Sequence, residues 1–425
     1  MTHPGKSTRA TVRSPRVRRL LLPVAAAAVV LVILVAIGLW ITRPGPSNPA
    51  VDLEPYMTDL DWPTALAFAP DGRIFFAERF TGTIRIIRDG AVLPLPFYTL
   101  SNTATSGEQG LLGLALHPDF PTAPWVYAYH TFDDPSGGLY NRIVRIRASG
   151  DNGTSLEVVL DRIPAGSVHN SGVIAFGPDG TLFALLGDAT SPNLAQDLST
   201  LNGKVVRLNA DGTVPSDNPF VGVVGANPYV YTYGHRNMFG LAFHPESGRV
   251  YVTENGPQDN DEVNLLVAGG NYGWPDVRGK ANSPSYIDPL IAYTPSIAPT
   301  NAAFYTGTDF PASRGDLFFG DWNTGRLHAL ALQPPFGTAV VTETIMETAP
   351  NGILEVEMGP DGKVWLTTSS TIYRIVPAEP ATASLALPGG TSLFGAAAAL
   401  GTSRIVRPRC GEPDPGSIRA PARKP

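Results

Sequence analysis

The chain has 425 residues with 31 basic and 37 acidic side chains, and their distribution along the chain is uneven. Without residues 1–19 and the segment after Pro377, 19 basic and 34 acidic residues remain, so the central part is acidic by 15. This balance argues against nucleic acid as a partner, because surfaces that bind nucleic acid are basic. The single cysteine, Cys410, excludes an intrachain disulfide.

The N-terminus has the pattern of a membrane anchor. Residues 1–19 contain six basic residues and no acid, and residues 20–41 form an uncharged apolar run of 22 residues. Such a run is long enough to cross about 30 Å of hydrocarbon. It ends in Leu-Trp-Ile-Thr-Arg-Pro rather than in a small-residue cleavage site, which favours a retained transmembrane helix over a cleaved signal peptide. The basic flank predicts a cytoplasmic N-terminus and an extracytoplasmic remainder.

The rest of the chain divides by composition. Residues 42–54 are a Pro-rich linker, residues 55–377 are the folded body, and residues 378–425 are an Ala-, Pro- and Gly-rich tail that we expect to be disordered. The whole chain contains 44 glycines and 41 prolines, and the body has few long stretches with helical periodicity. This composition favours turn-rich β-strands.

The body repeats one local pattern, in which a Pro-Asp-Gly type turn separates two apolar strands. Proline fixes φ, the aspartate caps the turn, and glycine takes the left-handed conformation that reverses the chain. The turn prolines are Pro70, Pro118, Pro178, Pro245, Pro311 and Pro360. Steps of 48 to 67 residues between them match propeller blades with long loops on one face. The sequence therefore predicts an all-β fold, a six-bladed β-propeller behind an N-terminal transmembrane helix.

The stretch 231–275 concentrates charged and oxygen-donating groups. Arg236 and Asn237 are adjacent, and four carboxylates follow: Glu254, Asp259, Asp261 and Glu262. Carboxylates beside the backbone carbonyls of Gly256 and Pro257 suit a hard cation such as calcium. The spacing matches no EF-hand loop, so an acidic, solvated loop is an equally open interpretation.

Three motifs in this stretch resemble a known family. GHRNxxGLAFHP, ENGPxxxDEVN and GGNYGWP occur here in the order found in the glucose/sorbosone dehydrogenase family, and together they are more specific than any one alone. The likeness extends from about Trp62 to Pro377. The family includes soluble aldose sugar dehydrogenases that use pyrroloquinoline quinone (PQQ). The resemblance implies a six-bladed propeller, PQQ and calcium as cofactors, and a sugar or polyol as substrate.

His169 is the candidate catalytic residue. It precedes one of the Pro-Asp-Gly repeats, and a neutral imidazole suits the removal of an alcohol proton. A buried structural histidine is the alternative for this residue taken alone. The resemblance implies that His169 removes the proton of the sugar C1 hydroxyl as hydride passes to the quinone. Ser171 replaces a usual glycine of the family, and Val168 replaces an aspartate that some members have.

The resemblance also implies cofactor contacts. Gln109 corresponds to a glutamine that contacts substrate or quinone, and its amide offers both a donor and an acceptor. Arg236 and Asn237 correspond to the pair that holds the quinone, where a guanidinium suits carboxylate or quinone oxygens. We interpret His235 and His244 as structural.

Two calcium positions follow from the same resemblance. Gly256 and Pro257 correspond to backbone carbonyls that bind the calcium of the cofactor in some members. Glu262 and Tyr272 correspond to a second, structural calcium site of the shorter aldose dehydrogenases.

Three cationic positions of the family are not cationic in this chain. PQQ carries three carboxylates, and burying them without cations is costly. Asn323 stands at the position of a family lysine, and Gly352 and Leu354 stand at the positions of two arginines. Asp321 and Glu355 add negative charge nearby. At roughly 1.5–3 kcal/mol for each lost charge-assisted hydrogen bond, the sequence predicts much weaker PQQ binding unless other cations replace the lost ones. Arg278, Lys280 and Arg326 are the candidates for such compensation.

Three functions remain open at this point. The first is a membrane-tethered, extracytoplasmic oxidoreductase of aldoses or polyols with PQQ, calcium and an electron acceptor that the sequence does not identify. The second is a cofactor-free propeller that binds a glycan or a protein at the cell exterior, which the absent cations favour. The third is a calcium-dependent lactonase, because propellers with axial calcium also catalyse hydrolysis.

Overall fold

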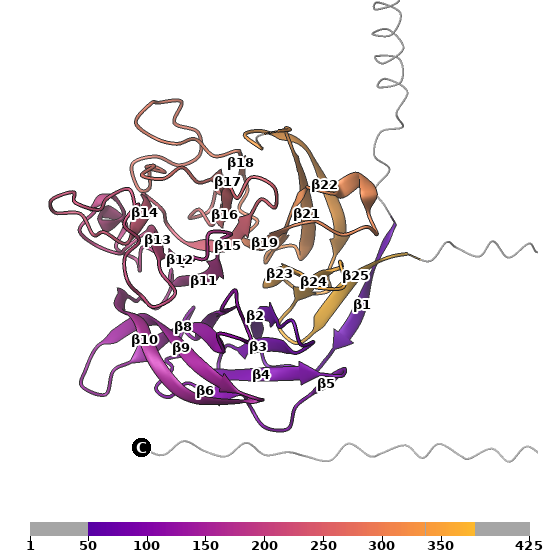
Figure 1. Cartoon of the computed structure of the whole chain (residues 1–425). Helices are drawn as coiled ribbons and strands as arrows, with labels where there is room; N and C mark the ends of the chain where they lie inside the picture. The colour runs from indigo at the N-terminus through magenta and orange to yellow at the C-terminus, as the bar shows by residue number, and fades with distance from the viewer. Residues whose placement is uncertain (1–49, 336, 379–425) are drawn as a thin grey trace, which may run out of the picture. The chain divides into compact units, whose positions relative to one another are not determined.

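The computed structural model describes residues 50–335 and 337–378, which form six antiparallel β-sheets around a common axis (Figure 1). This is the six-bladed β-propeller that the turn repeats predicted. Among the described residues, no helix is long and apolar enough to cross a membrane. The predicted anchor at residues 20–41 and the predicted tail after residue 378 lie outside the described residues.

Within each blade the strands are antiparallel and run in chain order from the axis outward. In the first three blades their bounds are β2 (Pro63–Phe68), β3 (Ile74–Glu78), β4 (Thr83–Arg88), β5 (Ala91–Val92), β6 (Tyr98–Thr99); β7 (Leu111–Leu116), β8 (Trp125–Asp133), β9 (Leu139–Ser149), β10 (Asn152–Pro164); β11 (Ser171–Phe176), β12 (Leu182–Leu186), β13 (Lys204–Leu208) and β14 (Val230–Tyr233). A short 3₁₀ helix, η1 (Pro192–Gln196), lies between β12 and β13.

The last three blades continue the same plan. Their bounds are β15 (Met238–Phe243), β16 (Val250–Glu254), β17 (Asp261–Leu265), β18 (Ile291–Tyr293); β19 (Pro299–Phe304), β20 (Leu317–Asp321), β21 (Arg326–Leu332), β22 (Val340–Thr348); β23 (Glu355–Met358), β24 (Val364–Thr367), β25 (Ile372–Pro377) and, from the start of the chain, β1 (Val51–Met57). A second 3₁₀ helix, η2 (Pro311–Ser313), precedes β20.

The two ends of the folded body meet in the sixth blade. β1 pairs antiparallel with β25, with Val51 opposite Pro377, and so supplies the outermost strand of the last sheet. Residues 51–54, which the sequence analysis included in the linker, are the first part of this strand. The pairing closes the ring, because blade six is completed by a strand that precedes blade one.

Each predicted Pro-Asp-Gly turn connects the innermost strand of a blade to the next strand. In the first blade the turn at Pro70 lies between β2 and β3, and Gly72 has a φ of +88°. An L-residue rarely adopts this conformation, so glycine is needed there. The innermost strands β2, β7, β11, β15, β19 and β23 pack side by side around the axis.

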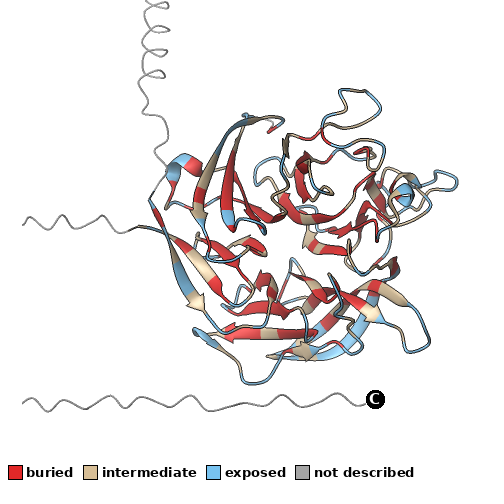
Figure 2. Cartoon of the chain, turned by 180° about the vertical axis from the view of Figure 1, so that it is seen from behind, coloured by how far each residue is buried: buried red, intermediate tan, exposed pale blue. Residues whose placement is uncertain are grey.

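The apolar core lies between neighbouring blades. Figure 2 shows buried residues along the inner strands and exposed residues at the outer edges. Between the first two blades, Phe75, Ile86, Val126 and Val144 belong to one buried cluster. The outermost strand β10 is mostly exposed. Burial of the inner strands fixes the positions of the loops that precede them.

A buried histidine connects three strands of the fifth blade. The two ring nitrogens of His328 lie 2.9 Å from Asp321 Oδ2 and 2.6 Å from Glu343 Oε1, and the ring stacks on Phe319 with centroids 4.6 Å apart. Both nitrogens donate to carboxylates only when the ring is protonated. Burial opposes that charge, but the hydrogen bonds to Asp321 and Glu343 outweigh it and raise the pKa of His328.

We therefore expect the stability of the propeller to depend on pH through His328. Because its pKa is higher in the folded state than the value of about 6.5 for an unfolded histidine, its contribution is complete below about pH 6.5 and is lost as the pH rises through the folded pKa. H328Q should be less stable than the wild type by about 2 kcal/mol at pH 6, and the difference should shrink toward pH 9. Urea unfolding across this pH range measures the effect.

His117 provides the matched control, since its Nδ1 accepts a backbone hydrogen bond from Asp119. H117Q should show no comparable change with pH. An equal loss for H328Q at pH 6 and pH 9 would contradict a protonated His328.

Candidate active site

The loops that precede the innermost strands meet at one end of the axis and surround a cavity of about 350 Å³. All six blades line it, and one lining residue from each is Trp62, Glu108, Ser171, Asn255, Thr300 and Leu354. We call this the axial cavity. Its volume is within the range of small-molecule sites, and its position on the axis brings together loops that are far apart in sequence.

His169 is paired with a buried carboxylate. Its Nδ1 lies 2.7 Å from Oδ1 of Asp188, which is 1% exposed. Asp188 also accepts hydrogen bonds from the backbone of Thr190 at 2.8 Å and from Trp274 Nε1 at 2.8 Å. A carboxylate at Nδ1 keeps the proton on that nitrogen and leaves Nε2 as the proton acceptor. The pair therefore has the chemistry of a general base.

The backbone at His169 is held in an uncommon conformation. His169 has a φ of +61° and Ser171 a φ of +52°, both in the left-handed region that non-glycine residues seldom adopt. The amide of His169 donates to Glu108 Oε2 at 2.6 Å, and Ser171 Oγ accepts from the backbone of Met238 at 2.9 Å. These contacts to the second and fourth blades stabilise the strained turn and fix the direction of the imidazole.

Glu108 is the carboxylate that joins three blades. Its Oε2 accepts from the amide of His169 and, at 3.1 Å, from Asn237 Nδ2. The Asn237 side chain is buried, and its Oδ1 accepts from the backbone of Ser171 at 3.2 Å. Asn237, a predicted cofactor contact, thus positions the loop of His169. The sequence pattern did not identify Glu108, although it is the neighbour of Gln109.

Gln109 has a similar supporting position. Its side chain is buried, Nε2 donates to the carbonyl of Gly166 at 2.9 Å, and Oε1 accepts from the amide of Ser106 at 3.2 Å. Gly166 belongs to the loop that carries His169. Because both ends of the amide contact the backbone, Gln109 shapes this loop rather than presenting a free amide to a ligand.

Arg236 lies at the same end of the propeller as His169. Its carbonyl accepts from the amide of Asp188 at 2.8 Å, and its guanidinium lies 5.5 Å from the Trp274 ring centroid. Its Nη1 donates to the carbonyls of Asn255 and Gly256, both at 2.9 Å. Burial lowers the pKa of Arg236. His169 and Arg236 are thus linked through Asp188 and Trp274, which contact both residues or each other.

The four predicted calcium ligands, Gly256, Pro257, Glu262 and Tyr272, line one small cavity beside Arg236. The carbonyl of Gly256 already accepts a hydrogen bond from Arg236 Nη1, so the guanidinium lies at the oxygen where calcium is expected. In residues 50–335 and 337–378, no group of three or more His, Cys, Asp or Glu side chains is arranged to hold a metal. Calcium at the Gly256 carbonyl would lie beside the Arg236 guanidinium, and calcium binding at Gly256 and Pro257 stays a prediction.

The side chains at the second predicted calcium position also have hydrogen-bond partners within the protein. The Glu262 carboxyl group accepts from Asn264 Nδ2 at 3.0 Å and from the amide of Gly279 at 2.8 Å, and the Tyr272 hydroxyl donates to the carbonyl of Leu265 at 2.7 Å. Burial raises the pKa of Glu262 to about 8. Both residues of the second predicted calcium position therefore already have hydrogen-bond partners within the protein, and calcium binding there stays a prediction.

The structure shows what occupies the three missing cationic positions. Asn323 donates its side-chain amide to the carbonyl of Ser296 at 3.0 Å and is exposed, and Leu354 lines the axial cavity. A Cβ at Gly352 would lie 2.5 Å from both the ring and the backbone carbonyl oxygen of Trp322, so residue 322 fills the space of any side chain there. None of the three positions brings a charge to the cavity.

One arginine of the cavity was not identified from the sequence. Arg79 follows β3, lines the axial cavity, and donates to the carbonyls of Gln109 at 3.2 Å and of Gly107. Glu108 and Glu355 line the same cavity. Burial raises the pKa of Glu355 well above its usual value, and Asn301 donates to it.

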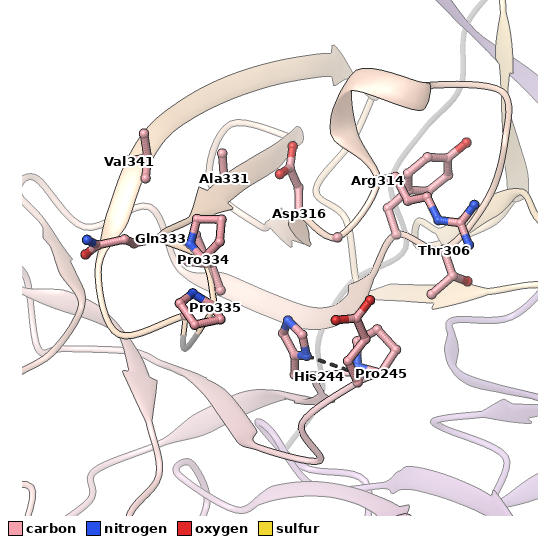
Figure 3. A pocket seen from close by; sticks show the side chains of 15 residues that line it. His244, Pro245, Thr306, Arg314, Asp316, Ala331, Gln333, Pro334, Pro335 and Val341 are labelled. Atoms are coloured by element: carbon pink, nitrogen blue, oxygen red, sulfur yellow. Dashed lines mark hydrogen bonds between the residues drawn. The ribbon is translucent and has the colours of Figure 1, made fainter. Parts of the chain in front are cut away.

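A larger cavity, of about 640 Å³, lies at the other end of β19 (Figure 3). Its lining includes His244, Arg314, Asp316 and Pro334. His244 Nδ1 accepts from the backbone of Glu246 at 3.3 Å, which agrees with a structural role. Because this cavity is separated from the axial cavity by the length of β19, it is distinct from the site of His169.

Fold and site together define a six-bladed propeller with a histidine–aspartate pair beside an axial cavity of small-molecule size. The chain belongs to the Glucose / Sorbosone dehydrogenase family, whose model matches residues 60–376.

Several relatives are similar over the whole propeller. An oxidoreductase of Thermus thermophilus, provisionally named as a glucose dehydrogenase, is 42% identical with a TM-score of 0.72 and covers 77% of this chain and 100% of its own. The PQQ-bound aldose sugar dehydrogenase of Streptomyces coelicolor is 31% identical with a TM-score of 0.67, covering 78% and 99%. Aldose sugar dehydrogenase YliI of Escherichia coli is 29% identical, covering 78% of this chain and 93% of its own.

PQQ in a relative raises the question of whether the residues of this chain fit it. Among the described residues that line the axial cavity, Arg79 is the only cation, and Glu108 and Glu355 are also present. Arg236 and Arg278 lie outside this lining, each with its guanidinium near the Trp274 ring, and Arg236 Nη1 already donates to backbone carbonyls. Three carboxylates would therefore be buried against a balanced or acidic lining, which is unfavourable. The residues present do not fit this tricarboxylate.

The bridging role of Glu108 can be tested by its removal. E108A should leave the amide of His169 and Asn237 Nδ2 without their acceptor and lower the free energy of unfolding by about 1–3 kcal/mol. Urea unfolding monitored by circular dichroism gives this value. The exposed Glu246 supplies the control, and E246A should change stability by less than about 0.5 kcal/mol. Equal stabilities of the two variants would contradict the bridge.

Proposed function

We propose that the protein is an extracytoplasmic, membrane-tethered dehydrogenase that oxidises a hydroxyl group of an aldose or related polyol. The observation that carries the proposal is the 2.7 Å contact between His169 Nδ1 and buried Asp188. Family membership supports it, as does the aldose sugar dehydrogenase name of two relatives. The basic residues 1–19 and the apolar run 20–41 support the tether and the location.

The proposed reaction begins with a proton transfer. Nε2 of His169 accepts the hydroxyl proton of the sugar, and the carboxylate of Asp188 stabilises the imidazolium that forms. As the O–H bond breaks, the carbon–oxygen double bond forms and the hydride on that carbon leaves to a bound two-electron acceptor. Thr190 and Trp274 keep Asp188 in place through their hydrogen bonds at 2.8 Å. Loops from several blades hold the substrate over the base.

Substitution of the pair tests the base. H169Q should lower the rate of sugar-dependent dye reduction by about 10²–10⁴-fold, because proton removal in the transition state is lost. D188N should also lower the rate, because an amide can stabilise the wrong tautomer of His169. The assay follows a redox dye with a panel of aldoses and added quinones. Circular dichroism checks that each variant is folded.

H117Q, on the far side of the same propeller from the proposed base, is the control and should retain the wild-type rate. A wild-type rate in H169Q would overturn the assignment of the base. Binding of a glycan without any dye reduction by the wild type would support the second function, a cofactor-free propeller, which the missing cations at Asn323, Gly352 and Leu354 favour.

A further inference from the structure

The mouth of the axial cavity is aromatic. The rings of Trp62, from the loop before β2, and Trp322, from the loop after β20, lie with centroids 5.5 Å apart and planes inclined by 32°. Phe80 packs edge-on against Trp62 at 5.2 Å. Trp62 has a φ of +47°, so its backbone is held in a conformation that costs energy. Because this strained backbone is retained, we infer that the surrounding contacts hold the Trp62 ring at this position.

The charges around these rings nearly cancel. The guanidinium of Arg79 lies 5.5 Å from the Trp62 ring and 4.7 Å from the Phe80 ring, and its charge interacts with that of Glu108. Leu354 and Phe239 provide apolar wall. The cavity thus offers flat aromatic surface and one guanidinium that is already partly neutralised. It suits a planar ring without several negative charges.

Two buried oxygens of the cavity lack partners. The Oγ1 of Thr300, a residue 7% exposed, and the Oδ1 of Asn255 have no hydrogen-bond partner among the described residues, and both residues line the cavity. Buried polar atoms are rarely left unpaired, because the loss of hydration is costly. A ligand with a few polar edge atoms would satisfy them.

We propose that the axial cavity binds a planar quinone without carboxylate groups and discriminates against tricarboxylate PQQ. Trp62 and Trp322 contact the flat face of the ring, and Thr300 and Asn255 contact its polar edge. The role of this quinone as hydride acceptor rests on the proposed function. In that role the quinone takes the hydride from the sugar carbon and a proton by way of His169. It becomes the hydroquinone as the alcohol becomes the carbonyl, so atoms and electrons balance.

Binding can be measured without turnover by isothermal titration calorimetry of the purified propeller. The probes are 1,10-phenanthroline-5,6-dione, an uncharged planar ortho-quinone, and PQQ. We expect the uncharged quinone to bind at least about 100-fold more tightly than PQQ, as the loss of charge-assisted hydrogen bonds implies. Equal binding of both probes, or tighter binding of PQQ, would overturn the proposal.

Two sets of variants locate the effect. W322A should weaken binding of the uncharged quinone by about 3–10-fold, whereas W322F, which keeps a ring, should weaken it less. L354R should strengthen PQQ binding by about tenfold or more, because it places a guanidinium in the lining. The double variant W322L/L354R, which removes one ring of the aromatic pair and adds a guanidinium to the lining, should reverse the preference between the probes.

Trp125 supplies the matched control, since it lies on β8 away from the cavity. W125F should change neither affinity. If the double variant does not fold, L354R alone tests the effect of the added charge. Unchanged PQQ binding in folded L354R would contradict the proposal. A wild type that binds the uncharged quinone but reduces no dye with any sugar would overturn the proposed function and leave this inference standing.

Discussion

The antiparallel pairing of β1 with β25 is the constraint on which the site depends. It joins the first described strand of the chain to the last, and so completes the sixth blade and closes the ring. The axial cavity needs this closure, because its lining comes from all six blades. With an open ring, Trp62 of the first blade and Leu354 of the last would no longer face the same space. A contact at the outer edge therefore determines the geometry at the axis.

Within the closed ring, side chains that the family resemblance associates with cofactor mostly support loops. Asn237 and Gln109 use their amides to hold the loop of His169, and Glu108 accepts hydrogen bonds from two different blades. The position of His169 is therefore specified by contacts within the protein. Because these contacts do not include the residues that line the Trp62–Trp322 side of the cavity, the position of the imidazole does not depend on the charge of that side.

The sequence predicted the blades well because their turns are local. Each of the six turns of this type is encoded within a few residues and connects the innermost strand of a blade to the next strand, and three of them have the sequence Pro-Asp-Gly itself. The pairing of Val51 with Pro377 is not local, and no short pattern reveals it. Asp188 lies 19 residues from His169 and Glu108 lies 61 residues away, each in a loop with no motif of its own. Asp188 and Glu108 can therefore be identified as partners of His169 only from the folded structure.

Asn323 and Gly352 depart from the family pattern in two different ways. At Asn323 a charge is simply absent, and the residue is exposed. At Gly352 the absence is coupled to a gain elsewhere, because the Trp322 ring fills the volume that a side chain at residue 352 would need. A side chain at residue 352 would need both the ring and the backbone carbonyl of Trp322 to move, and the ring belongs to the Trp62 contact at the cavity mouth. The glycine at residue 352 and the aromatic surface of Trp322 are thus coupled, and this part of the molecule presents a ring where the family resemblance implies a guanidinium.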